Sequence, residues 1–125
     1  MSSAPITLTL NADPSYARLV RMTASNAGLL SSMSMDRVED IRMAAEEAFI
    51  YACTVQAGHP LTISFLVTDE GLTMRFQLAV DEFSEPDPEN PTSLYADLIL
   101  GSVCDSYQKL CCPAALVLEL EADVR

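Results

Sequence analysis

Apolar residues recur at spacings of three and four between Met35 and Val55, and this is the clearest pattern in the chain. Such spacing places residues on one side of an α-helix. Asp36 is a candidate cap for the first turn, and Glu39, three residues later, would complete a capping box. We therefore predict a helix that begins at Asp36 and buries one stripe. The residues of that stripe are Val38, Ile41, Ala45, Ala48, Ala52 and Val55.

Alternation of apolar and polar residues predicts the strands. Ile6, Leu8 and Leu10 alternate with polar residues, as in a half-buried strand. The segments 61–67 and 72–80 flank a turn at 68–71 and predict a β-hairpin. A last strand is expected from Ala114 to Val124.

Two further helices complete the predicted order. Asp13 and Pro14 form a helix start signal, and Ser31 to Ser34 interrupt the pattern before the Asp36 helix. A third helix is expected from Leu94 to Leu110. The predicted order is strand, helix, helix, strand, strand, helix, strand. The predicted inner face of the first helix comprises Tyr16, Leu19, Val20, Thr23, Ala27 and Leu30.

The segments Glu39–Arg42 and Ala44–Ala48 resemble the nucleotide-binding helix of the GHKL (histidine kinase-like) ATPase superfamily, most closely that of the anti-sigma factor serine/threonine kinases. The resemblance covers the whole chain and implies one domain, residues 1–125. It implies an α/β two-layer sandwich of the histidine kinase-like ATPase fold, with a mixed β-sheet covered on one face by three helices. It also places Glu47 on the family's general base, and Tyr51 on the asparagine that holds the magnesium of MgATP.

Other positions of the family's nucleotide site are altered. A phenol such as Tyr51 is a poor magnesium ligand, because it is neutral at pH 7 and the ion prefers carboxylate, amide carbonyl and water oxygens. Asp81 falls on the aspartate that binds adenine, but Phe83 and Glu85 replace the glycines that follow it. The glycines expected near 94–96 are absent as well. We expect a degenerate site in which the Tyr51 ring fills the space of the nucleotide.

Charge supports this expectation. The segment 81–91 has five carboxylates, three prolines and no basic residue, and it would repel a triphosphate. The chain as a whole has seven basic and eighteen acidic residues, a net charge of −11, which argues against nucleic acid and anionic membranes as partners. There is no apolar run of ~18 residues and no signal peptide, so we expect a cytoplasmic protein.

The four cysteines lack the C-x-x-C spacing of a zinc site, and His59 stands alone in a turn. We expect no metal site, with the cysteines acting as small buried hydrophobes. The adjacent pair Cys111 and Cys112 leaves an alternative open, in which the pair is redox-active or binds a soft metal.

Three functions are compatible with these patterns. The first is an anti-sigma-factor-like regulator that binds a sigma factor or an anti-anti-sigma factor and needs no cofactor; the resemblance implies that it forms a homodimer. Met22, Met33, Met35 and Met43 lie in the two-helix region, where flexible thioether side chains would suit such an interface as well as core filling. The second is an active serine/threonine kinase that uses MgATP, with Glu47 as base and Asp81 on adenine. The third is a sensory or scaffold domain that binds another small ligand in the remodelled cleft.

Overall fold

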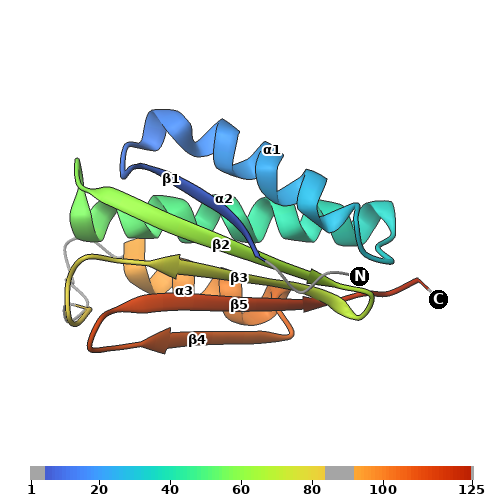
Figure 1. Cartoon of the computed structure of the whole chain (residues 1–125). Coiled ribbons are helices and arrows are strands. Elements are labelled where there is room, and N and C mark those ends of the chain that lie inside the picture. Colours follow the sequence, from blue (N-terminus) through green and yellow to red (C-terminus); the bar gives the residue numbers. More distant parts are fainter. Residues whose placement is uncertain (1–4, 84–91, 125) are drawn as a thin grey trace.

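The computed structural model describes residues 5–83 and 92–124 (Figure 1). No helix in these two ranges has both the length and the apolar character needed to span a membrane. The elements follow in the order β1 (Ile6–Asn11), a short 3-10 helix η1 (Pro14–Tyr16), α1 (Ala17–Gly28), α2 (Met35–Gln56), β2 (Pro60–Thr68), β3 (Gly71–Gln77), α3 (Thr92–Val103), β4 (Ser106–Leu110) and β5 (Ala115–Glu121).

The strands of the described residues form one five-stranded sheet in the order β1-β2-β3-β5-β4. Every pairing in this sheet is antiparallel, so the predicted mixed sheet is wrong. The reason is visible between β1 and β2. The helices α1 and α2 form a hairpin, so β2 begins beside the end of β1, with Pro60 paired to Asn11 (Figure 1). The two strands therefore run in opposite directions.

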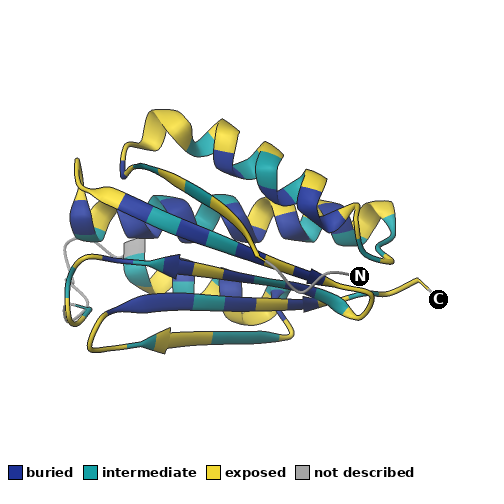
Figure 2. Cartoon of the chain, in the orientation of Figure 1, coloured by how far each residue is buried: buried dark blue, intermediate teal, exposed yellow. Residues whose placement is uncertain are grey.

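The helices cover one face of the sheet, which makes the molecule a two-layer α/β sandwich (Figures 1 and 2). Alternate residues of β2, β3 and β5 point into the space between the layers and are buried. The opposite face is polar and half-exposed, with side chains such as Thr62, Thr73 and Arg75. The largest fully buried side chains include Phe49, Phe65, Phe76, Ile41, Leu61, Ile63, Met74, Leu116 and Leu118.

Helix α2 is the centre of the helical layer. All residues of its predicted stripe are buried except Val55, which is half-buried, and Ala44, Phe49 and Cys53 are buried in addition. The predicted cap is wrong. Ser34 caps the helix by accepting a hydrogen bond from the backbone N–H of Arg37 at 3.1 Å, and Asp36 lies within the first turn. Glu39 accepts a hydrogen bond from Arg42 at 3.2 Å and so does not close the predicted capping box.

The predicted helix start at Asp13 and Pro14 opens the 3-10 helix η1, where Asp13 accepts from the backbone N–H of Ser15 at 3.0 Å. Helix α1 follows at Ala17 without a side-chain cap. Its predicted inner face is only partly correct. Small residues determine the face that packs on α2, and a Cβ atom added to Gly28 would lie 2.6 Å from Ile41 Cδ1. The buried residues are Val20, Ala24, Ala27 and Gly28, whereas Tyr16, Leu19 and Leu30 are exposed.

The predicted third helix is too long. Helix α3 ends at Val103, and Ser106–Leu110 forms the edge strand β4, which the sequence analysis did not predict. Leu100, Val103, Tyr107 and Leu110 continue a spacing of three and four, so the helical period extends into the strand. The hairpin prediction is confirmed, since Thr68 pairs with Gly71 across the turn.

Candidate functional site

Tyr51 lies at the centre of a cluster of side chains from both layers. Its side chain is 3 % exposed. The ring centroid of Tyr51 lies 5.6 Å from that of Phe83, with an interplanar angle of 34°. The ammonium nitrogen Nζ of Lys109 lies 5.1 Å from the centroid of each ring. We call Tyr51, Phe83, Lys109, Tyr107 and Asp97 the Tyr51 cluster.

Strand β4 brings Lys109 and Tyr107 to this cluster. Lys109 pairs with Leu116 and Tyr107 with Leu118, and both partners are buried on the helix-covered face of the sheet. The two polar side chains therefore point toward the helices. There they meet Asp97 of α3. The Tyr107 hydroxyl donates to Asp97 Oδ1 at 2.6 Å, and Lys109 Nζ donates to Asp97 Oδ2 at 3.2 Å.

The charges in the cluster compensate one another. Burial lowers the pKa of Lys109, but the Tyr51 hydroxyl and the Asp97 carboxylate outweigh this effect and leave the pKa raised. Lys109 is therefore a cation held beside two aromatic rings, an attractive arrangement within about 6 Å. Burial, the hydrogen bond to Asp97 and its charge raise the pKa of Tyr107, so its hydroxyl stays protonated and acts as a donor.

The site residues predicted from the sequence lie around this cluster. Glu47 is half-buried, one helical turn before Tyr51. The ion pair of this part of α2 is formed by its neighbour Glu46, with Arg21 at 3.0 Å. Asp81 is exposed two residues before Phe83, and its carbonyl oxygen accepts from the backbone N–H of Cys112 at 2.8 Å. Glu85 lies outside the described residues, as does most of the acidic segment 81–91.

These residues do not fit MgATP, the cofactor that the resemblance implies. By the resemblance, the Tyr51 hydroxyl and the Phe83 ring would take the places of a magnesium ligand and a glycine, and the two rings contact each other. Residues 94–96, predicted to replace a glycine-rich phosphate loop, belong to α3, and Ala96 is buried in the core. Within residues 5–83 and 92–124, no group of three or more His, Cys, Asp or Glu side chains could hold a metal ion.

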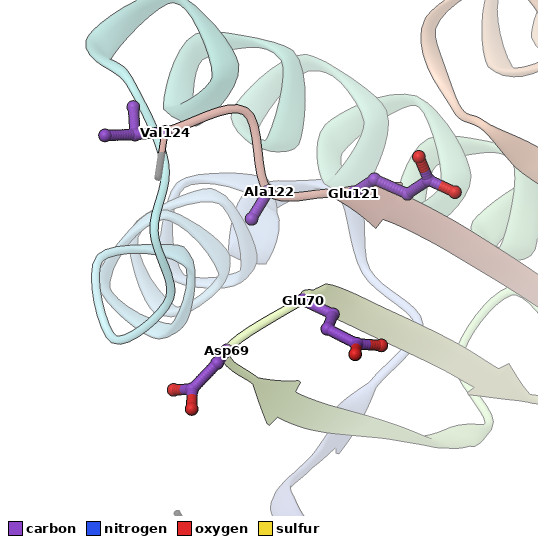
Figure 3. A pocket seen from close by; sticks show the side chains of 5 residues that line it. All are labelled: Asp69, Glu70, Glu121, Ala122 and Val124. Atoms are coloured by element: carbon purple, nitrogen blue, oxygen red, sulfur yellow. The ribbon is translucent and has the colours of Figure 1, made fainter.

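A surface depression of about 450 Å³ lies near the turn between β2 and β3 (Figure 3). It is lined by Asp69, Glu70, Glu121, Ala122 and Val124. Figure 3 shows that the three carboxylates point in different directions and do not converge on one point. The lining is acidic and suits neither a phosphate nor a single cation.

The prediction for the cysteines is half correct. Cys53 and Cys104 are buried, and burial raises their pKa to about 11 and about 12. Cys111 and Cys112 are exposed in the turn between β4 and β5, so the expectation of burial is wrong for this pair.

Sequence reasoning missed Asp97, Tyr107 and Lys109. Their roles depend on β4. In a strand, alternate residues such as Tyr107 and Lys109 point to the same face, whereas in the predicted helix through residue 110 they would not. One signal was available. Asp105 and Ser106 are turn-forming residues directly after Cys104, and they mark the end of α3.

Comparison with protein-family models and with curated proteins finds no match to this chain. The assignment of a function therefore depends on the geometry of the Tyr51 cluster, on the surface of the helical layer and on the resemblance in α2.

Proposed function

We propose that this chain is an anti-sigma-factor-like regulatory protein that binds a protein partner, a sigma factor or an anti-anti-sigma factor, without using a nucleotide. The observation that supports the proposal best is the filled Tyr51 cluster. A nucleotide seated beside α2 would have to displace the Phe83 ring and separate Lys109 from Asp97, at 3.2 Å. Each displaced contact would weaken nucleotide binding.

Exposed apolar side chains support a protein partner. Leu19, Met22, Leu29 and Leu30 are 49–57 % exposed on α1 and the residues directly after it. We call these four residues the α1 apolar surface; Figure 2 shows the exposed outer side of α1. Apolar groups gathered on one exposed surface mark protein interaction sites more often than isolated ones do. Met35 and Met43 of α2 are also exposed, and flexible thioether side chains adapt to a partner's shape.

The identity of the partner follows from chemistry only in part. With a net charge of −11, the chain attracts a basic protein surface and repels an acidic one. A second copy is the alternative occupant of the α1 apolar surface, as the homodimer implied by the resemblance would require. Sigma factors and anti-anti-sigma factors enter the proposal through the resemblance in α2 alone.

Calorimetric titration with MgATP tests the absence of nucleotide binding. We expect no measurable heat of binding at millimolar nucleotide, which corresponds to less than about 4 kcal/mol of binding free energy. The double variant Tyr51→Asn, Phe83→Gly, checked for folding by circular dichroism, shows whether the rings are what blocks the site. A low-micromolar dissociation constant for the wild-type chain would contradict the proposal.

The kinase alternative has its own test. If Glu47 is a general base, the wild-type chain transfers phosphate from MgATP to a serine of the partner, and Glu47→Gln abolishes transfer because an amide cannot accept the proton. Glu46→Gln is the matched control, since Glu46 pairs with Arg21 on the same helix. We expect no transfer by any of the three proteins.

A further inference from the structure

Cys111 and Cys112 form a pair of accessible thiols that the proposed function does not use. Both side chains are exposed in the turn between β4 and β5, and their Sγ atoms lie 3.3 Å apart. The other two cysteines, Cys53 and Cys104, are buried. A reagent in solution can therefore reach two thiols, and these two are adjacent to each other.

The turn is held in place by the segment that follows β3. The backbone N–H of Cys112 donates to the Asp81 carbonyl at 2.8 Å, and that of Ala114 donates to the Val80 carbonyl at 2.9 Å. Cys112 has a φ of 64°, a left-handed conformation that glycine adopts more easily than cysteine. Backbone strain of this kind is concentrated at functional sites. The backbone that carries the two thiols is thus held in place, and a fixed backbone lowers the entropy lost when both sulfurs bind one atom.

The separation of the sulfurs restricts which atom can bind both. Bonds from sulfur to a soft metal are about 2.3 Å long, so two sulfurs 3.3 Å apart subtend an angle of about 90° at a shared centre. A linear two-coordinate ion would need a separation of about 4.6 Å by the same bond length. Zinc requires four ligands, and the described residues offer no group of three or more ligand side chains. A pyramidal centre with bonds near right angles fits both sulfurs as they stand.

We propose that Cys111 and Cys112 form a chelating site for trivalent arsenic or a metalloid of the same chemistry. Each thiol proton leaves with one hydroxide of the arsenic centre as water, while two As–O bonds break and two As–S bonds form. No electron is transferred, so no oxidant is required. The third arsenic substituent points to solvent.

Phenylarsine oxide is the probe for this site. The fully reduced chain should take up one equivalent, measured by intact-protein mass spectrometry, with loss of both accessible thiols in a thiol titration. Excess glutathione should leave the adduct intact, whereas a small dithiol such as 2,3-dimercaptopropanol should remove it. Cys111→Ser and Cys112→Ser should each weaken binding by about 100-fold or more, because the second bond is no longer intramolecular.

Cys53→Ala, with circular dichroism to confirm folding, is the control and should bind the probe as the wild type does. Two arsenicals per chain, or unchanged affinity in either serine variant, would overturn the proposal. These outcomes do not depend on MgATP or on a protein partner, so they are separable from failure of the proposed function.

Discussion

Gln56 connects three parts of the fold through one side chain. It is the buried polar residue of the described core, with 3 % of its surface exposed. Its Nε2 donates to the Pro60 carbonyl at 2.9 Å, and its Oε1 accepts from the backbone N–H of Ala79 at 2.6 Å. The end of α2 is thereby fixed to the first residue of β2 and to the segment that leads to Phe83.

Gln56→Ala should lower the free energy of unfolding by about 1–3 kcal/mol, because two partly buried hydrogen bonds to the backbone are lost. Urea denaturation measures the change. Gln108→Ala is the control, since Gln108 is exposed on β4, and it should stay within about 0.5 kcal/mol of the wild type. Equal stability of Gln56→Ala and the wild type would mean that water replaces the side chain at both backbone groups.

Tyr51 shows how far single residues could be interpreted from the sequence. Tyr51 is buried and contacts Phe83. That its ring fills the space of a nucleotide stays a prediction. The cation beside the ring could not be predicted, because Lys109 is 58 positions away and reaches Tyr51 only through the pairing of β4 with β5. Local patterns do not encode such pairings, which depend on the register of the whole sheet.

At the scale of elements, the start of α2 is fastened by the last described residues of the chain. Asp123 Oδ1 accepts from the backbone N–H of Ser34 at 2.7 Å, and Asp123 Oδ2 accepts from the Ser34 hydroxyl. Ser34 in turn caps the helix through the N–H of Arg37. A carboxylate at this end of a helix also interacts favourably with the helix dipole.

This arrangement predicts a pH dependence. The hydrogen bonds from Ser34 lower the pKa of Asp123 from its ordinary value of 3.8. Because the folded pKa lies below the unfolded one, the carboxylate stabilises the fold above pH 3.8, and the contribution is lost as the pH falls through the lowered pKa. Asp123→Asn should therefore melt below the wild type at neutral pH, and the gap in melting temperature should close in acid.

Glu119→Gln is the control, because it removes an exposed carboxylate from the open face of the sheet without touching Ser34. Its melting temperature should follow that of the wild type. The prediction would be wrong if the difference in melting temperature between Asp123→Asn and the wild type were the same at neutral pH and in strong acid. The effect would then come from the shape of the side chain and not from its charge.

The elements themselves were predicted unevenly. The hairpin, the strands and the central helix were predicted from the spacing of apolar residues, which is two in strands and three to four in helices. This spacing is a local property of the sequence. The cap of α2 was misplaced by two residues because Ser34 and Asp36 are both capping residue types, and only the position of Asp123 selects Ser34. Strand β4 was missed because its apolar spacing continues that of α3.

On the scale of the whole molecule, the acidic residues are unevenly distributed. The chain has eighteen acidic residues, yet none lies within α1, which has Arg18 and Arg21. The α1 apolar surface is therefore free of carboxylates on its own helix. A partner can dock there on apolar contacts while the acidic remainder of the molecule steers a basic partner toward it.

Met22→Glu should weaken binding to the partner by at least about tenfold, because a charge at the centre of an interface loses its hydration. Pairwise binding measurements with sigma factors and anti-anti-sigma factors provide the test. Thr73→Glu, on the open face of the sheet, should bind as the wild type does.

Sedimentation of the same variants decides whether a second copy uses the surface. If it does, the wild type sediments as a dimer and Met22→Glu as a monomer. Unchanged partner affinity and unchanged sedimentation of Met22→Glu would exclude α1 as an interface.

The hydrogen bond between Tyr107 and Asp97 has an optical consequence. The chain has no tryptophan and four tyrosines. A tyrosine that donates to a carboxylate emits little light, because its excited state passes the proton to the acceptor. We therefore expect Tyr107 to be quenched, so that the other three tyrosines supply most of the fluorescence. Any event that separates β4 from α3 should increase the tyrosine fluorescence. The state of the Tyr51 cluster can therefore be followed without an added label.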